Sequence, residues 1–156
     1  MMMGHIIMLA LVVLAGAVLS MQAAINGRLG ESVGVIRSSQ LTFVVGAVFS
    51  GLLIFFFEPT HSQTLLTVPK WQLAGALFGM FYMLVMVASV PKIGVATATV
   101  AVICGQLSMG MMIDTFGWFG NQAIGFSSSR MAALACLALA LVLIYRSNQA
   151  AEQSVE

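Results

Sequence analysis

The sequence contains very few charged residues. Six basic and five acidic side chains make up 7% of its 156 residues, whereas charged side chains make up about 25% of an ordinary soluble domain. The net charge of +1 is too small for a protein that binds nucleic acid through its phosphates. We therefore expect neither a soluble globular domain nor a nucleic-acid partner.

The sequence signatures of enzymes and of cofactor or metal sites are also missing. No GxGxxG, GxxxxGK[ST], HExxH or CxxC pattern occurs, so nucleotide, zinc and thiol-redox chemistry have no starting point. The two cysteines, Cys104 and Cys136, lie inside apolar runs and are interpreted as small hydrophobic residues. No nucleophile can be matched with a base. We expect a protein that is not an enzyme and that has no catalytic residue, cofactor or metal.

Apolar residues, by contrast, are abundant, at 60% of the chain with a mean hydropathy of +1.04. At a rise of 1.5 Å per residue, a helix of about 20 uncharged residues spans the hydrocarbon core of a bilayer. The sequence has five such stretches of 19 to 21 residues, at 6–25, 38–57, 71–90, 93–113 and 127–145. We predict an all-α integral membrane protein with five transmembrane helices in one domain over residues 1–146.

The segments between these stretches are too short to hold a soluble domain. We expect loops at residues 26–37, 58–70 and 114–126. Pro91 and Lys92 are expected to form a tight turn that makes the third and fourth helices an antiparallel hairpin. Residues 147–156 are polar and are expected to form a disordered tail.

Positive charge is nearly balanced between the two sides of the membrane. Alternate loops carry Arg28, Arg37, Lys92 and Arg146 on one side, and Lys70 and Arg130 on the other. The positive-inside rule therefore favours an outside N-terminus and an inside C-terminus by four to two. The small margin also fits dual topology, in which the chain inserts both ways and pairs with an inverted copy.

Five polar side chains within or near the spans are candidate substrate-binding residues. Gln106 lies well inside the fourth stretch, where an unpartnered amide costs several kcal/mol, so it must face protein or water. Thr99 precedes it by seven residues, Gln22 and Asn26 share one face of the first helix, and Tyr82 is central in the third. Hydrogen bonding between helices and the lining of a substrate path are both consistent with these residues.

Small residues form stripes along several of the predicted helices. Gly16, Ser20, Ala23 and Gly27 share one face of the first helix, and Gly75 and Gly79 have the spacing of a close-packing motif in the third. Such stripes let helix backbones approach one another in membranes. No acidic or basic residue and no histidine lies in a span core, so a proton relay has no carboxylate.

Four blocks of sequence carry a resemblance to a known family. They are QAAINGRLG at 22–30, FVVG at 43–46, PKIG at 91–94, and the segment from GQL at 105–107 through DTFG at 114–117. In these blocks, and over residues 8 to 146 as a whole, the chain resembles the YdcZ-like family of small bacterial integral membrane proteins, in the drug/metabolite transporter superfamily. The segment from Gln106 to Gly117 is the most specific part.

This resemblance implies a bacterial inner (cytoplasmic) membrane protein that crosses the membrane several times. It implies one five-helix half of a ten-helix inverted-repeat transporter fold, working as an antiparallel homodimer or as a heterodimer with a similar chain. Relatives in the superfamily that export cations carry a glutamate in their first helix. The first helix here has no acid, so that mechanism is not carried over.

Three functions agree with the sequence. We favour a secondary transporter of a small metabolite or amphiphilic compound, with a weakly polar site near the bilayer midplane. A small dual-topology channel subunit would also tolerate balanced charge and the lack of a relay. The third alternative is a non-transporting assembly partner of another membrane protein.

Overall fold

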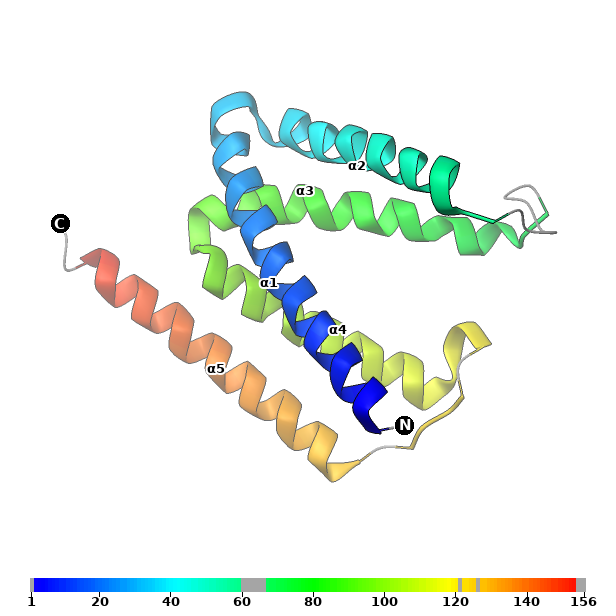
Figure 1. Cartoon of the computed structure of the whole chain (residues 1–156). Coiled ribbons are helices and arrows are strands. Elements are labelled where there is room, and N and C mark those ends of the chain that lie inside the picture. Colours follow the sequence, from blue (N-terminus) through cyan, green and yellow to red (C-terminus); the bar gives the residue numbers. More distant parts are fainter. Residues whose placement is uncertain (1, 60–66, 121, 126, 154–156) are drawn as a thin grey trace. The chain divides into compact units, whose positions relative to one another are not determined.

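The computed structural model describes residues 2–59, 67–120, 122–125 and 127–153, and these contain helices and no strands. The five α-helices, labelled in Figure 1, are long and apolar enough to cross a membrane. Two short 3-10 helices lie between them in the chain: η1 precedes α3 and η2 follows α4. The prediction of an all-α membrane protein with five transmembrane helices is confirmed. The helices are α1 (Met2–Val33), α2 (Val35–Phe57), η1 (Lys70–Ala74), α3 (Gly75–Ile93), α4 (Val95–Phe116), η2 (Trp118–Gly120) and α5 (Ser128–Gln153).

The chain divides into two compact units, Met1–Lys92 and Ile93–Glu156. The first unit contains α1, α2 and nearly all of α3, and the second contains α4 and α5. The predicted antiparallel arrangement of the third and fourth helices concerns both units and stays a prediction.

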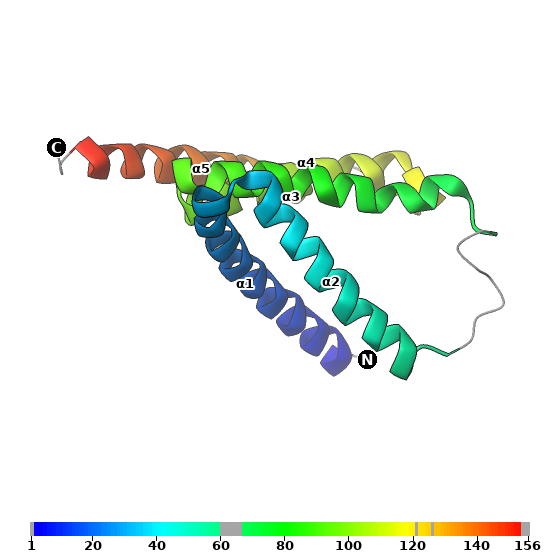
Figure 2. The ribbon, with the colours of Figure 1, turned by 90° about the horizontal axis from the view of Figure 1, so that it is seen from above.

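A single glycine separates α1 from α2. Gly34 has a φ of +94°, which L side chains rarely adopt. Its N–H donates to the Gly30 carbonyl at 2.9 Å, and its carbonyl accepts from the Ser38 N–H at 3.1 Å. The two helices form a hairpin that closes at this bend (Figure 2). The expected loop at 26–37 is therefore wrong, because α1 extends through its polar end to Val33.

The third helix also continues beyond its expected end. Pro91 lies inside α3, which ends at Ile93, so the tight turn expected at Pro91 and Lys92 is wrong. A proline inside a helix lacks the N–H that would bond the carbonyl four residues earlier, and its ring crowds that carbonyl; α3 ends two residues after Pro91. The break falls instead at Gly94, where φ is +78°.

Within the first unit, α1 crosses α3 at close range. A Cβ atom added to Gly27 would lie 2.9 Å from Cγ1 of Val90, and one added to Gly30 would lie 2.5 Å from Cγ1 of Val87. Because they have no side chain, Gly27 and Gly30 allow α1 and α3 to approach this closely. The stripe of small residues on the first helix predicts such an approach at Gly27. By contrast, Gly75 and Gly79 have no neighbour within 4 Å of an added Cβ.

Within the second unit, α4 and α5 run antiparallel (Figure 1). At one end of the pair, Nδ2 of Asn148 donates to Oγ1 of Thr97 at 2.8 Å. At the other end, Nη1 of Arg130 lies 3.1 Å from Oδ2 of Asp114. The expectation of a disordered tail is wrong for 147–153, because α5 continues to Gln153 and Asn148 binds α4. The last three residues lie outside the described part of the chain.

Most of the large apolar side chains are exposed. The buried apolar side chains are few and lie mainly where helices cross, as Val87 and Val90 do on α3. In a bilayer, the exposed side chains contact lipid tails that are as apolar as they are. Contacts between small residues and hydrogen bonds between helices therefore determine how each unit packs.

Candidate functional site

Asn26 is buried near the end of α1, at 8% exposure. Its Nδ2 donates to Sδ of Met83 on α3 at 3.7 Å, and a thioether is a weak acceptor. Its backbone carbonyl accepts a 2.9 Å hydrogen bond from Oγ of Ser38, which is fully buried on α2. Asn26 therefore connects three helices.

Gln22 and Tyr82 lie at the same pocket as Met83. Both are half-buried, and both line a pocket of about 10 Å³ between α1 and α3, with Met83, Met86 and Val87 among its walls. Such a volume is about the size of one water molecule. The structure thus brings together three of the five predicted site residues, Gln22, Asn26 and Tyr82, around the α1–α3 crossing.

The remaining two predicted residues lie on α4, in the second unit. Thr99 is half-buried, whereas Gln106, in the middle of the helix, is exposed. Gln106 follows Thr97 by nine residues, which at 100° per residue puts it about 180° around the helix. Because Thr97 contacts α5, Gln106 faces away from α5. Its amide has no hydrogen bond to any other residue that the structure describes.

A larger groove lies between α2 and α3, with a volume of about 700 Å³. This is within the range of pockets that bind small molecules. Its walls are apolar apart from Ser39 and Gln40 near the start of α2. The Ser39 hydroxyl is buried and has no hydrogen-bond partner among the described residues. None of the predicted site residues lines this groove.

Ser38 and Asn148 each form a hydrogen bond between helices that no sequence motif predicts. Ser38 directly follows Arg37 at the start of an uncharged stretch. Asn148 lies in the polar segment 147–156, whose composition predicts a tail. The four-residue spacing of Tyr145 and Gln149 is a sequence signal that the helix extends past residue 145. In the structure, Nε2 of Gln149 donates to the Tyr145 hydroxyl at 2.9 Å.

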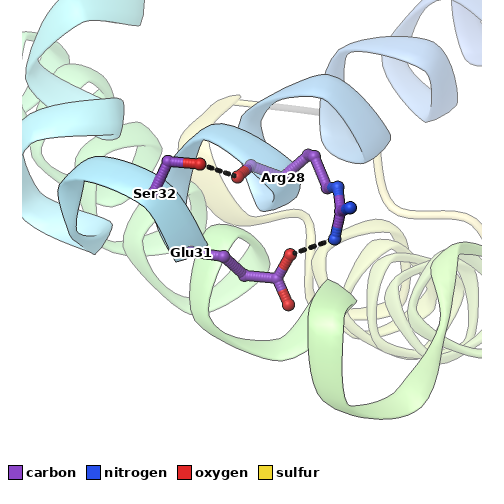
Figure 3. Close-up of polar contacts among 3 residues, drawn as sticks. All are labelled: Arg28, Glu31 and Ser32. Carbon is purple, nitrogen blue, oxygen red and sulfur yellow. Dashed lines mark hydrogen bonds and ion pairs between the residues drawn. The ribbon is translucent and has the colours of Figure 1, made fainter.

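In the described part of the chain, one ion pair lies near the end of α1 and another joins α4 to α5. Nη1 of Arg28 contacts Oε2 of Glu31 at 3.0 Å, and Oγ of Ser32 donates to the Arg28 carbonyl (Figure 3). The Arg28 side chain is 87% exposed, so this pair contributes little to stability. The pair of Asp114 and Arg130 is partly buried and joins α4 to α5. Both pairs belong to the structure of the helix ends and leave the span interiors uncharged.

A family model described as "Putative inner membrane exporter, YdcZ" matches residues 7–143. No curated protein matches the chain, and no solved structure matches it. Together with the five apolar helices, this match identifies a multi-pass protein of the inner membrane.

Proposed function

Because the chain belongs to the YdcZ family, we propose that it is a secondary transporter of a small metabolite or amphiphilic compound and that it works as a dimer of five-helix chains. The family description supports a general function, export across the inner membrane. The substrate class, the dimer and the residues of the substrate path are our proposal.

The position of Gln106 is the observation that carries the proposal. Its amide is exposed in the middle of α4, on the side away from α5. Facing lipid there would cost several kcal/mol, because hydrocarbon offers no hydrogen bonds. A second chain that covers this face, with a polar path between the two, would remove that cost. A site at this depth also fits the midplane position common to transporters built from inverted repeats.

The number of spans and the balance of charge support an inverted partner. Five spans put the two ends of the chain on opposite sides of the membrane. The four-to-two distribution of basic residues gives only a weak preference for one orientation. A five-helix chain of this kind is suited to be one half of a ten-helix inverted-repeat fold. A close paralogue in the opposite orientation would serve equally as the partner.

The proposed site residues are uncharged. Gln22, Asn26, Tyr82, Thr99 and Gln106 carry amide, phenol and hydroxyl groups. A weakly polar compound suits groups of this kind, whereas an ion would find no compensating charge.

Cross-linking through α4 tests the dimer and its orientation together. Thr99 and Ile113 lie seven residues before and after Gln106, so all three share one face of the helix. Cys104 and Cys136 are first replaced by alanine, and two differently tagged copies then carry Thr99→Cys and Ile113→Cys. In an antiparallel pair, Thr99→Cys of one copy lies at the depth of Ile113→Cys of the other, and a short thiol cross-linker joins the two tags.

Gln106→Cys is the matched control, because a residue at mid-span meets its counterpart in either orientation. We expect cross-links for Gln106→Cys alone and for the mixed Thr99→Cys and Ile113→Cys pair. Cross-links of Thr99→Cys only to itself would contradict antiparallel pairing. No cross-link at any of the three positions would contradict a homodimer formed through this face of α4.

Reconstituted flux separates the transporter from the two alternative functions. Saturable uptake into proteoliposomes is the result expected of a transporter. Fast passive ion conductance would instead identify a channel subunit, which the balanced charge also allows. Neither activity, with a stable complex to another membrane protein, would identify an assembly partner.

A further inference from the structure

A groove between α4 and α5 has one apolar end and one polar end. Its volume is about 430 Å³. Thr97 and Ala101 line it on α4, and Ile93, the last residue of α3, lines it four residues before Thr97. On α5, it is lined by Leu141, Val142, Tyr145, Arg146 and Gln149. Because the helices are antiparallel and Thr97 contacts Asn148, the apolar end lies at Ala101 and the polar end at Arg146.

The polar end offers hydrogen-bond donors and a positive charge. Arg146 is exposed, and it forms no ion pair or hydrogen bond with another residue that the structure describes. The Tyr145 hydroxyl accepts from Nε2 of Gln149 at 2.9 Å, so its own proton remains available to an acceptor. Among the residues that the structure describes, no carboxylate lines the groove. This combination suits an anion with several acceptor oxygens, and a guanidinium is well shaped to bind phosphate.

The position along α5 gives the depth in the membrane. Arg146 is the first charged residue after the uncharged stretch 127–145, so it lies at the level of the lipid headgroups, while Leu141 and Val142 lie in the hydrocarbon. We propose that this groove binds an anionic phospholipid, with its phosphate at Arg146 and Tyr145 and an acyl chain along Ala101, Leu141 and Val142.

Other occupants use only part of the groove. An apolar helix of a second copy would leave Arg146 without an anion, and free phosphate would leave the apolar end empty. A phospholipid fills both ends and is present at high concentration around the protein. Basic pockets between transmembrane helices bind anionic headgroups in this way.

Native mass spectrometry of the detergent-solubilised protein tests the headgroup contact. Phosphatidylglycerol and phosphatidylcholine with identical acyl chains are compared, so that only the headgroup differs. The wild type is expected to bind phosphatidylglycerol more tightly. Arg146→Gln should lower that binding about fivefold, the contribution of one basic residue near an anionic lipid surface, and Arg146→Lys should keep most of it. Because Arg146 is exposed, neither change disturbs packing.

Arg37→Gln is the matched control, because Arg37 is also an exposed arginine near a helix end but does not line this groove. It should leave the preference unchanged. Equal losses in Arg146→Gln and Arg37→Gln would overturn the proposal, since they would indicate attraction to net charge rather than a site.

A second comparison tests the apolar end. Ala101→Phe fills this end and should weaken the binding of both lipids, with detergent melting measured alongside. Millimolar inorganic phosphate should not displace phosphatidylglycerol. Displacement by inorganic phosphate, or unchanged binding in a folded Ala101→Phe variant, would overturn the assignment to a phospholipid.

Discussion

Replacing Gly30 with alanine should destabilise the crossing of α1 and α3. The added Cβ would lie 2.5 Å from Cγ1 of Val87, whereas carbon atoms in contact are separated by about 3.5–4.0 Å. The two groups must therefore move apart by about 1 Å. Val87 is 1% exposed and its β-branched side chain is stiff at χ1, so it cannot turn aside without moving α3.

The size of the effect follows from two opposing terms. Overpacking a well-packed site costs about 1–3 kcal/mol. A glycine-to-alanine change inside a helix contributes about 1 kcal/mol of helix propensity in return. Gly16 on the same helix has nothing within 4 Å of an added Cβ, so Gly16→Ala carries only the second term. We expect Gly30→Ala to be about 1–3 kcal/mol less stable than Gly16→Ala.

Equilibrium unfolding in detergent micelles, followed by helix content, measures this difference. Val87→Ala removes the methyl group that the new Cβ meets, so it should restore part of the stability of Gly30→Ala. The coupling free energy between the two changes should be about 0.5–3 kcal/mol. Equal stability of Gly30→Ala and Gly16→Ala, or a coupling free energy of zero, would refute the close approach of α1 and α3.

Three further substitutions test individual features by the same unfolding measurement. Ser38→Ala removes the 2.9 Å bond to the Asn26 carbonyl and should cost about 0.6 kcal/mol, the average for such bonds in membranes; no loss would mean that this bond does not stabilise the α1–α2 hairpin. Gly34→Ala should cost about 1–3 kcal/mol through its backbone conformation alone, with φ +94° and ψ +148°, because an added Cβ meets nothing within 4 Å; an unchanged stability would contradict the positive φ. Asp114→Asn breaks the pair with Arg130 and should cost at most about 1 kcal/mol, less at high salt; a larger cost, independent of salt, would contradict a partly solvated pair.

The spans could be predicted from the sequence because the bilayer imposes a length on uncharged stretches. The helix ends could not, because charged residues mark depth in the membrane rather than the point where a helix stops. Residues 26–33 are polar at several positions and still helical. The actual breaks at Gly34 and Gly94 depend on a positive φ, and many other glycines of the chain lack one.

The candidate site was predictable only in part, for a related reason. Gln22 and Asn26 share a helix face by their spacing alone. That Tyr82 reaches the same place depends on where α3 crosses α1, and Gly27 and Gly30 fix this through Val90 and Val87. Sequence periodicity gives the faces of a helix but not the register between helices. The depth of Gln106 in the membrane was predictable from its place in the uncharged stretch. The second chain that covers this residue remains a proposal.

The most direct test of the proposed transporter is uptake into proteoliposomes, using the compound that gives the largest thermal shift in a screen of metabolite classes. Wild-type protein, Gln106→Leu and the control Gln72→Leu are compared, since Gln72 is an exposed amide in η1 outside the predicted substrate path and outside the α2–α3 groove. We predict saturable uptake by the wild type and by Gln72→Leu, and loss of uptake in Gln106→Leu with unchanged melting and cross-linking. Full uptake by Gln106→Leu would contradict a substrate path lined by this residue.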